Sequence, residues 1–284
     1  MARWFVAGAA GMLGRDLCAA AGSAGHEVTR ADLPDVDILD LPALVPVVAG
    51  HDVVVNCAAY TAVDAAETDE ARAFAVNAVG AANLARAAEA TGATLVHLST
   101  DYVFAGDATE PYPADAPVAP RSAYGRTKAA GEWAVRAQCS RVHLVRTAWL
   151  YGASGASFPA TMKRLAAERE VLSVVDDQVG QPTWTVDLAD AVLRVVDSGA
   201  PFGTWHATGS GRCSWFDLAR AVFEELGLDP ARVTPTSSEA FERPAPRPAF
   251  SVLSHDMWAA AGLDPLPDWR DALHRAAPTV LATA

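Results

Sequence analysis

The chain has 284 residues, of which 51% are hydrophobic and 20% charged, so it can bury a sizeable core without disulfide or metal support. Its 22 basic and 34 acidic residues give a formal net charge of −12, which argues against the broad positive surface of a nucleic-acid-binding protein. No apolar run is long enough to span a bilayer, and the 4 cysteines are far apart, as is typical of reduced thiols. We therefore expect a cytoplasmic protein with no nucleic-acid or membrane partner.

The first half of the chain alternates short apolar segments with longer alanine-rich ones. The predicted strands are Trp4 to Ala7, Glu27 to Thr29, Val53 to Asn56, Thr94 to Ser99 and Arg141 to Thr147. Fully apolar strands are typical of a parallel sheet covered by helices on both faces. The clearest predicted helix runs from Asp69 to Ala90, where apolar residues recur at helical spacing. This β-α-β repetition predicts an α/β fold with a Rossmann-like doubly wound parallel sheet.

The pattern loosens after about residue 150, where we expect a second, smaller α/β region to begin. Its predicted elements are a helix at Ser157 to Glu168, a strand at Val171 to Val175, a helix at Thr185 to Val196, a strand at Thr204 to Ala207 and a helix at Ser214 to Leu226. The segment Thr234 to Pro248 contains four prolines, at 235, 244, 246 and 248, and is predicted to be an extended loop. Such a loop can form the wall of a pocket or a simple surface connection.

Three glycines follow the first predicted strand and precede a predicted helix. In the segment Gly8-Ala9-Ala10-Gly11-Met12-Leu13-Gly14, they let backbone N–H groups and the positive end of the helix dipole face a pyrophosphate. A side chain at these positions would hold the backbone away from the phosphates or prevent the turn. Close packing in an Ala- and Gly-rich turn is the competing interpretation. The position between strand and helix favours a dinucleotide site.

An acidic residue, Asp32, follows the second predicted strand, twenty-four residues after Gly8. An acid there can accept hydrogen bonds from the ribose hydroxyls of NADH and repels the 2′-phosphate of NADPH. Arg30 could instead contact that phosphate, so the choice between the two cofactors stays open. Asp37 and Ile38 are expected to border the adenine, with a solvated loop acid as the alternative for Asp37.

Small residues follow the third predicted strand, in the segment Asn56 to Asp64. Ligands of open α/β sheets bind at the carboxyl edge of the strands, where small side chains let a cofactor lie close to the backbone. Simple turn chemistry is the competing interpretation of this segment.

The strongest signal lies at the end of the fourth predicted strand and in the helix after it. Ser99, Thr100 and Asp101 end the strand, while Tyr124 and Lys128 are four residues apart on one face of the helix. The nearby ammonium is expected to lower the pKa of Tyr124, so that it acts as a general acid near neutral pH. The Thr100 hydroxyl can orient or polarise a carbonyl. A surface Tyr–Lys pair is the alternative for an isolated motif, but the preceding dinucleotide loop favours catalysis.

Several longer motifs occur in order along the chain. They are Gly8-x-x-Gly11-x-x-Gly14, Asn56 to Asp64, Leu98 to Phe104, Arg146 to Gly152, Val175 to Trp184 and Arg247 to Ser251. With them the chain resembles the dTDP-4-dehydrorhamnose reductase family of extended short-chain dehydrogenases/reductases over nearly its whole length. The resemblance implies a dinucleotide-binding Rossmann domain over residues 1–150 and a region over residues 151–284 that mainly binds a nucleotide sugar. Part of this region, about 171–198, would pack back on the Rossmann domain, and the active site would lie in the cleft.

The resemblance also implies a reaction and the residues that perform it. NADPH or NADH would reduce the C4 keto group of a dTDP-4-keto-6-deoxysugar, first of all dTDP-4-dehydrorhamnose, with Tyr124 as the proton donor and Lys128 holding the nicotinamide ribose. The expected catalytic residues are Thr100, Tyr124 and Lys128. Together with Gly8 of the loop, the expected cofactor contacts are Gly11, Met12, Leu13, Asp32, Asp37, Ile38, Ala58, Ala59, Tyr60, Tyr124 and Lys128. The expected substrate contacts are Thr100, Asp101 and Trp149.

Arg247 is a further candidate substrate contact, because a basic residue in a proline-bounded loop could neutralise the substrate diphosphate. A structural salt bridge is the alternative for this residue.

Some relatives bind Mg²⁺ at a dimer interface through glutamates. This chain has Asp16 at the first matching position and no clear glutamate equivalent at the others, which argues against metal dependence and leaves a homodimer open. Reductases of other dTDP-4-keto sugars, including a streptose-type sugar, share the motifs. Dehydratases of this fold usually have a second acid where this chain has Tyr102, which disfavours an epimerase or dehydratase. The alternative from another class is a non-catalytic, cofactor-binding regulatory subunit.

Overall fold

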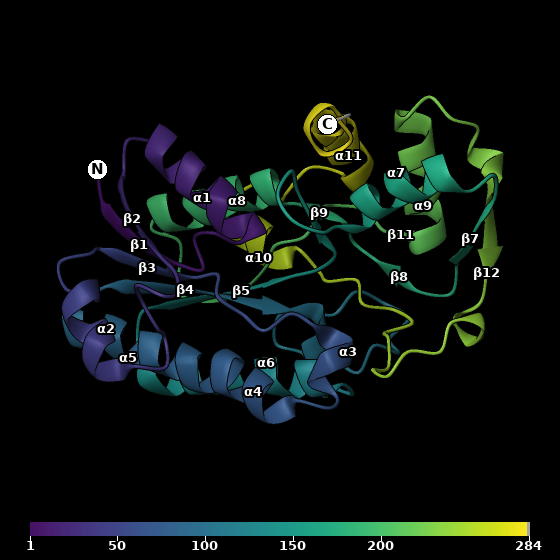
Figure 1. Ribbon diagram of the computed structural model, residues 1–284. Helices are drawn as coiled ribbons and strands as arrows, with labels where there is room; N and C mark the ends of the chain where they lie inside the picture. The colour runs from purple at the N-terminus through teal and green to yellow at the C-terminus, as the bar shows by residue number, and fades with distance from the viewer. Residues whose placement is uncertain (283–284) are drawn as a thin grey trace.

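The computed structural model describes residues 1–282, and its centre is a six-stranded sheet (Figure 1). The strand order is β10-β5-β4-β3-β1-β2, and all neighbouring strands are parallel. The strands are β1 (Arg3–Ala7), β2 (Glu27–Ala31), β3 (Val53–Asn56), β4 (Thr94–Thr100), β5 (Val142–Thr147) and β10 (Gly203–His206). The order reverses between β1 and β3, which is where open sheets of this kind bind ligands. The predicted Rossmann-like, doubly wound sheet is confirmed.

Helices cover both faces of this sheet, as Figure 1 shows. One face carries α1 (Met12–Ser23), α8 (Thr185–Asp197) and the short α10 (Asp256–Ala260). The other face carries α2 (Leu41–Val48), α3 (Val63–Ala66), α4 (Glu70–Phe74), α5 (Ala81–Thr91) and α6 (Ala123–Gln138). The helix predicted from Asp69 to Ala90 is present, but a π-helical segment, Ala75–Gly80, divides it into α4 and α5. No helix within residues 1–282 is both long and apolar enough to cross a membrane.

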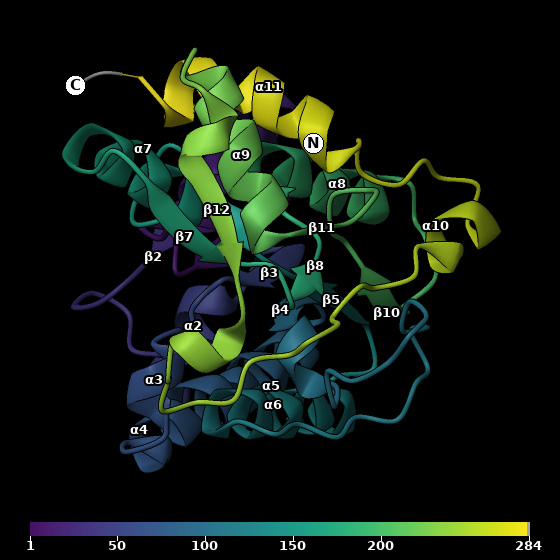
Figure 2. The same ribbon diagram turned by 90° about the vertical axis from the view of Figure 1, so that its right-hand side faces the viewer.

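A smaller lobe lies beside the carboxyl edge of the sheet (Figure 2). Its helices are α7 (Phe158–Glu168), α9 (Trp215–Glu225) and α11 (Trp269–Val280). Its strands form three pairs, which are β7 (Leu172–Val175) with β12 (Val233–Thr236), β8 (Val179–Gly180) with β11 (Cys213–Ser214), and β6 (Leu150–Tyr151) with β9 (Thr183–Trp184). Three short 3₁₀ turns complete the elements, at Asp101–Val103, Pro230–Arg232 and Ser238–Ala240. The chain crosses between the lobes repeatedly, because β7 lies in the small lobe while α8 and β10 return to the large sheet.

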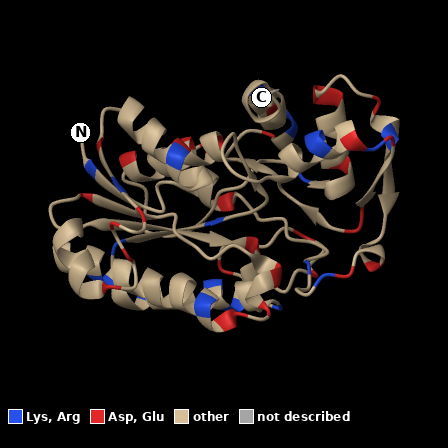
Figure 3. Ribbon diagram, in the orientation of Figure 1, with Lys and Arg blue, Asp and Glu red and all other residues tan. Residues whose placement is uncertain are grey.

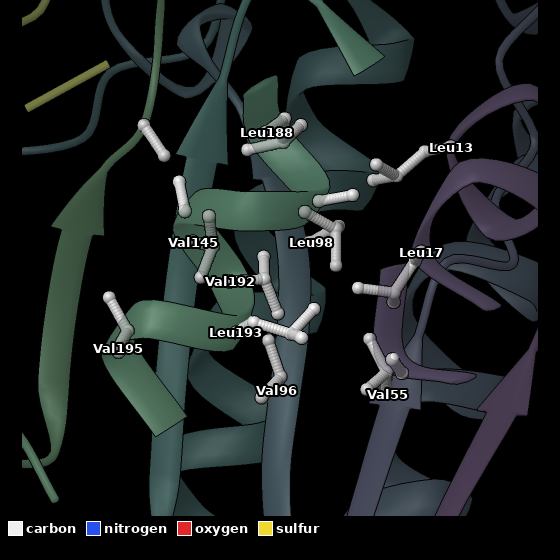
Figure 4. Packing of buried hydrophobic residues seen from close by; sticks show 14 of the residues in the cluster. Leu13, Leu17, Val55, Val96, Leu98, Val145, Leu188, Val192, Leu193 and Val195 are labelled. Carbon is white, nitrogen blue, oxygen red and sulfur yellow. The ribbon is translucent and has the colours of Figure 1, made fainter. Parts of the chain in front are cut away.

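A buried apolar cluster fixes α1 and α8 against the sheet. Figure 4 shows Leu17 of α1 and Val192 of α8 beside Val55 and Val96 of the strands. Leu17 is fully buried, and burial of such a side chain contributes about 1.5–3 kcal/mol. This packing holds the beginning of α1, and with it the glycine-rich loop, at the carboxyl edge of the sheet.

The prediction of an extended loop over Thr234 to Pro248 is wrong at its beginning. Residues 233–236 form β12, which pairs in parallel with β7 and places Pro235 opposite Val174. Since this sheet has only two strands, each strand is an edge, where a proline that lacks an N–H donor is tolerated. Proline indeed lacks the N–H group that a strand interior needs. Because β12 has a partner on one side only, that N–H group is not required at Pro235.

Candidate active site

The glycine-rich loop has a backbone that only glycine allows at two positions. Gly8 has φ +79°, and a Cβ there would lie 2.5 Å from the Ala58 backbone nitrogen. A Cβ on Gly14 would lie 2.1 Å from the Gly8 carbonyl oxygen. The helix that follows begins at Met12 without a side-chain cap, so its first N–H groups are free to meet an anion. The loop therefore fits the pyrophosphate of a dinucleotide.

Asp32 and Arg30 both contact the glycine-rich loop. The Ala10 N–H donates to Asp32 Oδ2 at 2.6 Å, and the Arg30 guanidinium donates to the Ala9 carbonyl at 3.1 Å. The structure thus brings the predicted ribose-binding acid to the loop, and places a cation beside it. Asp37 instead accepts a hydrogen bond from the Leu39 N–H, while Ile38 lies against Gly80 of the π-helical segment.

The segment after β3 is held by side chains that sequence reasoning did not single out. Asn56 Oδ1 accepts a hydrogen bond from the Ala58 N–H at 3.1 Å. The buried Asn77 holds Tyr60 at both its backbone N–H and its carbonyl, at 2.8 and 3.1 Å. The signal for Asn77 was an amide within an apolar helical pattern, since a buried amide must find partners. Ala58, Ala59 and Tyr60 consequently form a fixed border beside Gly8.

The predicted catalytic residues meet where β4 ends and α6 begins. Thr100 is the last residue of β4, and Ser122 caps α6 by accepting from the Gly125 N–H, which sets Tyr124 in the first turn. The Tyr124 phenol lies close enough to the Thr100 hydroxyl for this group to affect its pKa. Lys128 is 3% exposed, and its Nζ donates to the Leu98 carbonyl at 2.6 Å.

The expectation that Lys128 lowers the pKa of Tyr124 is wrong for the protein alone. Burial raises the pKa of Tyr124 to about 12, the nearby Thr100 hydroxyl opposes this, and the Asp101 charge adds to it. Lys128 does not counter the shift because its ammonium is turned to the Leu98 carbonyl. Burial also lowers the pKa of Lys128 to about 8. Tyr124 is therefore a neutral phenol near pH 7, with a proton to donate.

Asp101 is buried beside Thr100, whose hydroxyl donates to Asp101 Oδ1 at 2.9 Å. Burial raises the pKa of this carboxyl to about 6, although the hydrogen bond from Thr100 favours the charged form. The carboxylate is thus ionised at neutral pH at a cost to stability, as is common for groups that bind ligands.

Replacement of Asp101 by Asn should make the protein more stable, and more so at high pH. The folded pKa of about 6 lies above the ordinary 3.8, so the stability that the protonated carboxyl provides is present below pH 3.8 and lost as the pH rises through 6. We expect urea unfolding of the ligand-free protein to give D101N a gain of about 2–3 kcal/mol at pH 7.5 and about 1 kcal/mol at pH 4.5. An equal gain at both pH values would contradict the raised pKa.

A cavity of about 770 Å³ extends from this site into the smaller lobe. Tyr102 lines its inner end, and the Tyr102 ring packs edge-on to Tyr124 with ring centres 5.6 Å apart. Trp149 also lines the cavity and has the left-handed φ of 48°, which is rare for a large residue. Its indole stacks on the indole of Trp215, with ring centres 3.5 Å apart. The sequence did not indicate this partner. Trp149 and Arg247 thus border one cavity together with Tyr102, which directly follows Thr100 and Asp101 in the chain.

Asp16 does not belong to an acidic cluster. It accepts a hydrogen bond from the Thr185 hydroxyl at 2.5 Å, which links α1 to α8. Within residues 1–282, no group of three or more His, Cys, Asp or Glu side chains could hold a metal ion.

Known proteins resemble this chain over almost all of its length. The family described as RmlD substrate binding domain matches residues 2–281. A protein of Streptomyces antibioticus named probable dTDP-4,6-dihydroxy-2-methyloxan-3-one 4-ketoreductase is 51% identical, covering 99% of this chain and 96% of the relative. The dTDP-4-dehydrorhamnose reductase of Mycolicibacterium smegmatis is also 51% identical, with 98% of this chain and 86% of the relative covered.

A solved structure agrees with these relatives. The dTDP-4-dehydrorhamnose reductase of Bacillus anthracis, in complex with NADP, has a TM-score of 0.93 and 38% identity over 97% of this chain and 98% of its own. The order of motifs, the parallel sheet and the matches thus agree, and the chain belongs to the RmlD substrate binding domain family, which includes the dTDP-4-dehydrorhamnose reductases.

Proposed function

We propose that this protein is an NAD(P)H-dependent reductase of the C4 keto group of a dTDP-4-keto-6-deoxysugar, with dTDP-4-dehydrorhamnose as the first candidate substrate. The observation that carries the proposal is the buried, neutral Tyr124 phenol, whose ring packs against Tyr102 in the lining of a cavity of about 770 Å³. The names of the relatives from M. smegmatis and B. anthracis support this substrate, and the NADP in the latter structure supports the cofactor class.

The cofactor would lie along the carboxyl edge of the sheet. The glycine-rich loop and the N-terminus of α1 would bind its pyrophosphate, Asp32 or Arg30 its adenosine ribose, and Ala58 to Tyr60 its middle. When bound, the reduced nicotinamide supplies a hydride to the carbonyl carbon of the sugar. Lys128 would hold the adjoining ribose with the ammonium protons that Leu98 does not accept.

The residues of the chain would then stabilise and protonate the sugar oxygen. The Thr100 hydroxyl, which donates to Asp101 in the protein alone, would turn to the carbonyl oxygen of the sugar and polarise the ketone. Tyr124 gives its phenolic proton to this oxygen as negative charge develops there. Asp101, ionised above about pH 6, would accept a hydrogen bond from a sugar hydroxyl, and Trp149 would cover the ring. Arg247 would contact the diphosphate.

An absorbance assay at 340 nm tests the proposal directly. We expect the purified protein to oxidise NADH or NADPH when given dTDP-4-keto-6-deoxyglucose and a 3,5-epimerase, and the faster of the two shows the cofactor preference. A parallel reaction with EDTA shows whether a divalent metal contributes. Cofactor binding without oxidation of either cofactor would contradict the reductase and favour the regulatory-subunit alternative.

A second candidate substrate has specific support. The S. antibioticus relative, equally identical to this chain, is named for a different dTDP-linked ketone. The printed ketone lacks the hydroxyl next to the anomeric carbon, so the same assay with a dTDP-4-keto-2,6-dideoxysugar in place of dTDP-4-keto-6-deoxyglucose distinguishes the two candidates. We also place the reaction in the cytoplasm, since the described part of the chain carries its cysteines as free thiols.

A further inference from the structure

Asp64 links α3 to the proline-rich segment 241–248 beside the cavity. It lies in α3, directly after the segment that we assign to the cofactor, and its carboxylate is 31% exposed. The proline-rich segment 241–248 of the other lobe passes beside α3 in both views (Figures 1 and 2). Figure 3 shows basic and acidic positions close together along this segment. The contacts between α3 and segment 241–248 therefore involve charge.

Three groups of segment 241–248 converge on this one carboxylate. Arg247 Nη2 donates to Asp64 Oδ2 at 2.8 Å, and Arg243 Nη1 lies 3.7 Å from the same oxygen. The backbone N–H of Ala245 donates to Asp64 Oδ1 at 3.2 Å. Asp64 thus fixes a side chain and the backbone that carries it.

The remaining donors of the two arginines are available to the cavity. Both Arg243 and Arg247 line the 770 Å³ cavity, together with Tyr102 at its catalytic end. Arg247 uses one donor for Asp64 and one for the Ala245 carbonyl, and a guanidinium has five donors. The cavity is lined by Arg169, Arg243 and Arg247 against the single acid Glu242, so with Asp64 included the charges still leave one net positive charge, in a protein whose formal net charge is −12.

We propose that Asp64 is a positioning residue that holds Arg247 and segment 241–248 in the geometry that binds the diphosphate of the nucleotide sugar. This inference rests on the proposed function for its ligand. A guanidinium already fixed on one edge loses less conformational freedom when it binds a phosphate, so the carboxylate increases affinity without touching the ligand. Without Asp64, both arginines and a proline-rich strap must be ordered by the ligand itself.

A double-mutant cycle on dTDP binding tests the proposal. We expect calorimetry to show that R247M weakens dTDP binding about 30-fold, since a charged hydrogen-bond donor is lost. D64N should weaken it about 5- to 10-fold, through lost preorganisation. The D64N/R247M double variant should bind at most about twofold more weakly than R247M, because the contact with Arg247 is the shortest that Asp64 makes and carries most of its effect. Effects that multiply in the double variant would overturn the proposal.

A matched control uses another carboxylate–arginine pair of similar exposure. Glu70 pairs with Arg126 at 2.8 Å, with side chains 44% and 46% exposed, away from the cavity lining. E70Q should leave dTDP binding unchanged within about twofold, and D64E, which keeps the charge, should recover most of the affinity lost in D64N. We expect D64N to raise KM for the keto sugar and to leave kcat nearly unchanged. If Asp64 had only a structural role, D64N would instead lower the free energy of unfolding and kcat.

The outcomes separate this proposal from the proposed function. If the wild-type protein does not bind dTDP, the substrate class and the role of Asp64 both fall. If it binds dTDP and D64N binds equally well, only the role of Asp64 falls. If D64N loses affinity and no keto sugar is reduced, the diphosphate site stands and the proposed reaction is wrong.

Discussion

Replacement of Tyr124 by Phe should lower kcat for the keto sugar about 10³-fold, with cofactor binding nearly unchanged. Phe removes the phenolic proton and keeps the ring that packs against Tyr102 of the cavity lining. Steady-state rates at 340 nm and a fluorescence titration with NADPH measure the two effects separately. Turnover within tenfold of the wild-type protein would show that another group protonates the sugar oxygen.

The size of this effect follows from the state of the phenol. With a pKa of about 12, Tyr124 keeps its proton throughout the neutral range, so the loss cannot be offset by a change of pH. Lys128, with a pKa of about 8, loses its charge in mildly alkaline solution and does not replace the phenol as donor in Y124F, because one of its protons is held by Leu98 and the others are assigned to the nicotinamide ribose. Y124F therefore has no proton donor at this position, and a change in the pKa of a neighbouring group does not supply one.

Replacement of Arg146 by Met should destabilise the protein by about 3–5 kcal/mol, because it leaves a buried carboxylate without its partner. Arg146 and Glu132 are 3% and 2% exposed and form two hydrogen bonds of 2.9 and 2.8 Å. The Ser99 hydroxyl also donates to Glu132 at 2.6 Å, directly before Thr100 in β4. Urea unfolding of the ligand-free protein measures the loss.

Two further variants identify the cause of this loss. The double variant E132Q/R146M removes the buried charge and should recover at least half of the lost stability. The exposed pair provides the control, since R126M should cost less than about 1 kcal/mol. If the double variant were less stable than R146M, the loss would come from packing of the arginine and not from the unpaired charge. Burial lowers the pKa of Lys128, and the negative charge of Glu132 partly opposes this shift, so the buried pair also influences the catalytic site.

Local sequence determined the elements that repeat along the chain. The apolar strands, the glycines at 8 and 14 and the cap before Tyr124 are set by neighbouring residues, because hydrophobic periodicity, positive φ and capping act over a few positions. The i, i+4 spacing of Tyr124 and Lys128 likewise places both residues on one helix face without further information. These signals sufficed for the Rossmann-like sheet and for the family.

The tertiary structure decided what depends on partners distant in sequence. Pro235 became part of a strand because β7 lies beside it, and β10 joined the large sheet through pairing with β5. Burial raises the pKa of Tyr124. The Lys128 ammonium, which the spacing placed nearby, donates to the Leu98 carbonyl instead of lowering that pKa. The contact of Arg247 with Asp64 spans 183 positions of sequence. Desolvation and long-range charge pairing arise only when the chain has folded, so no local pattern contains them.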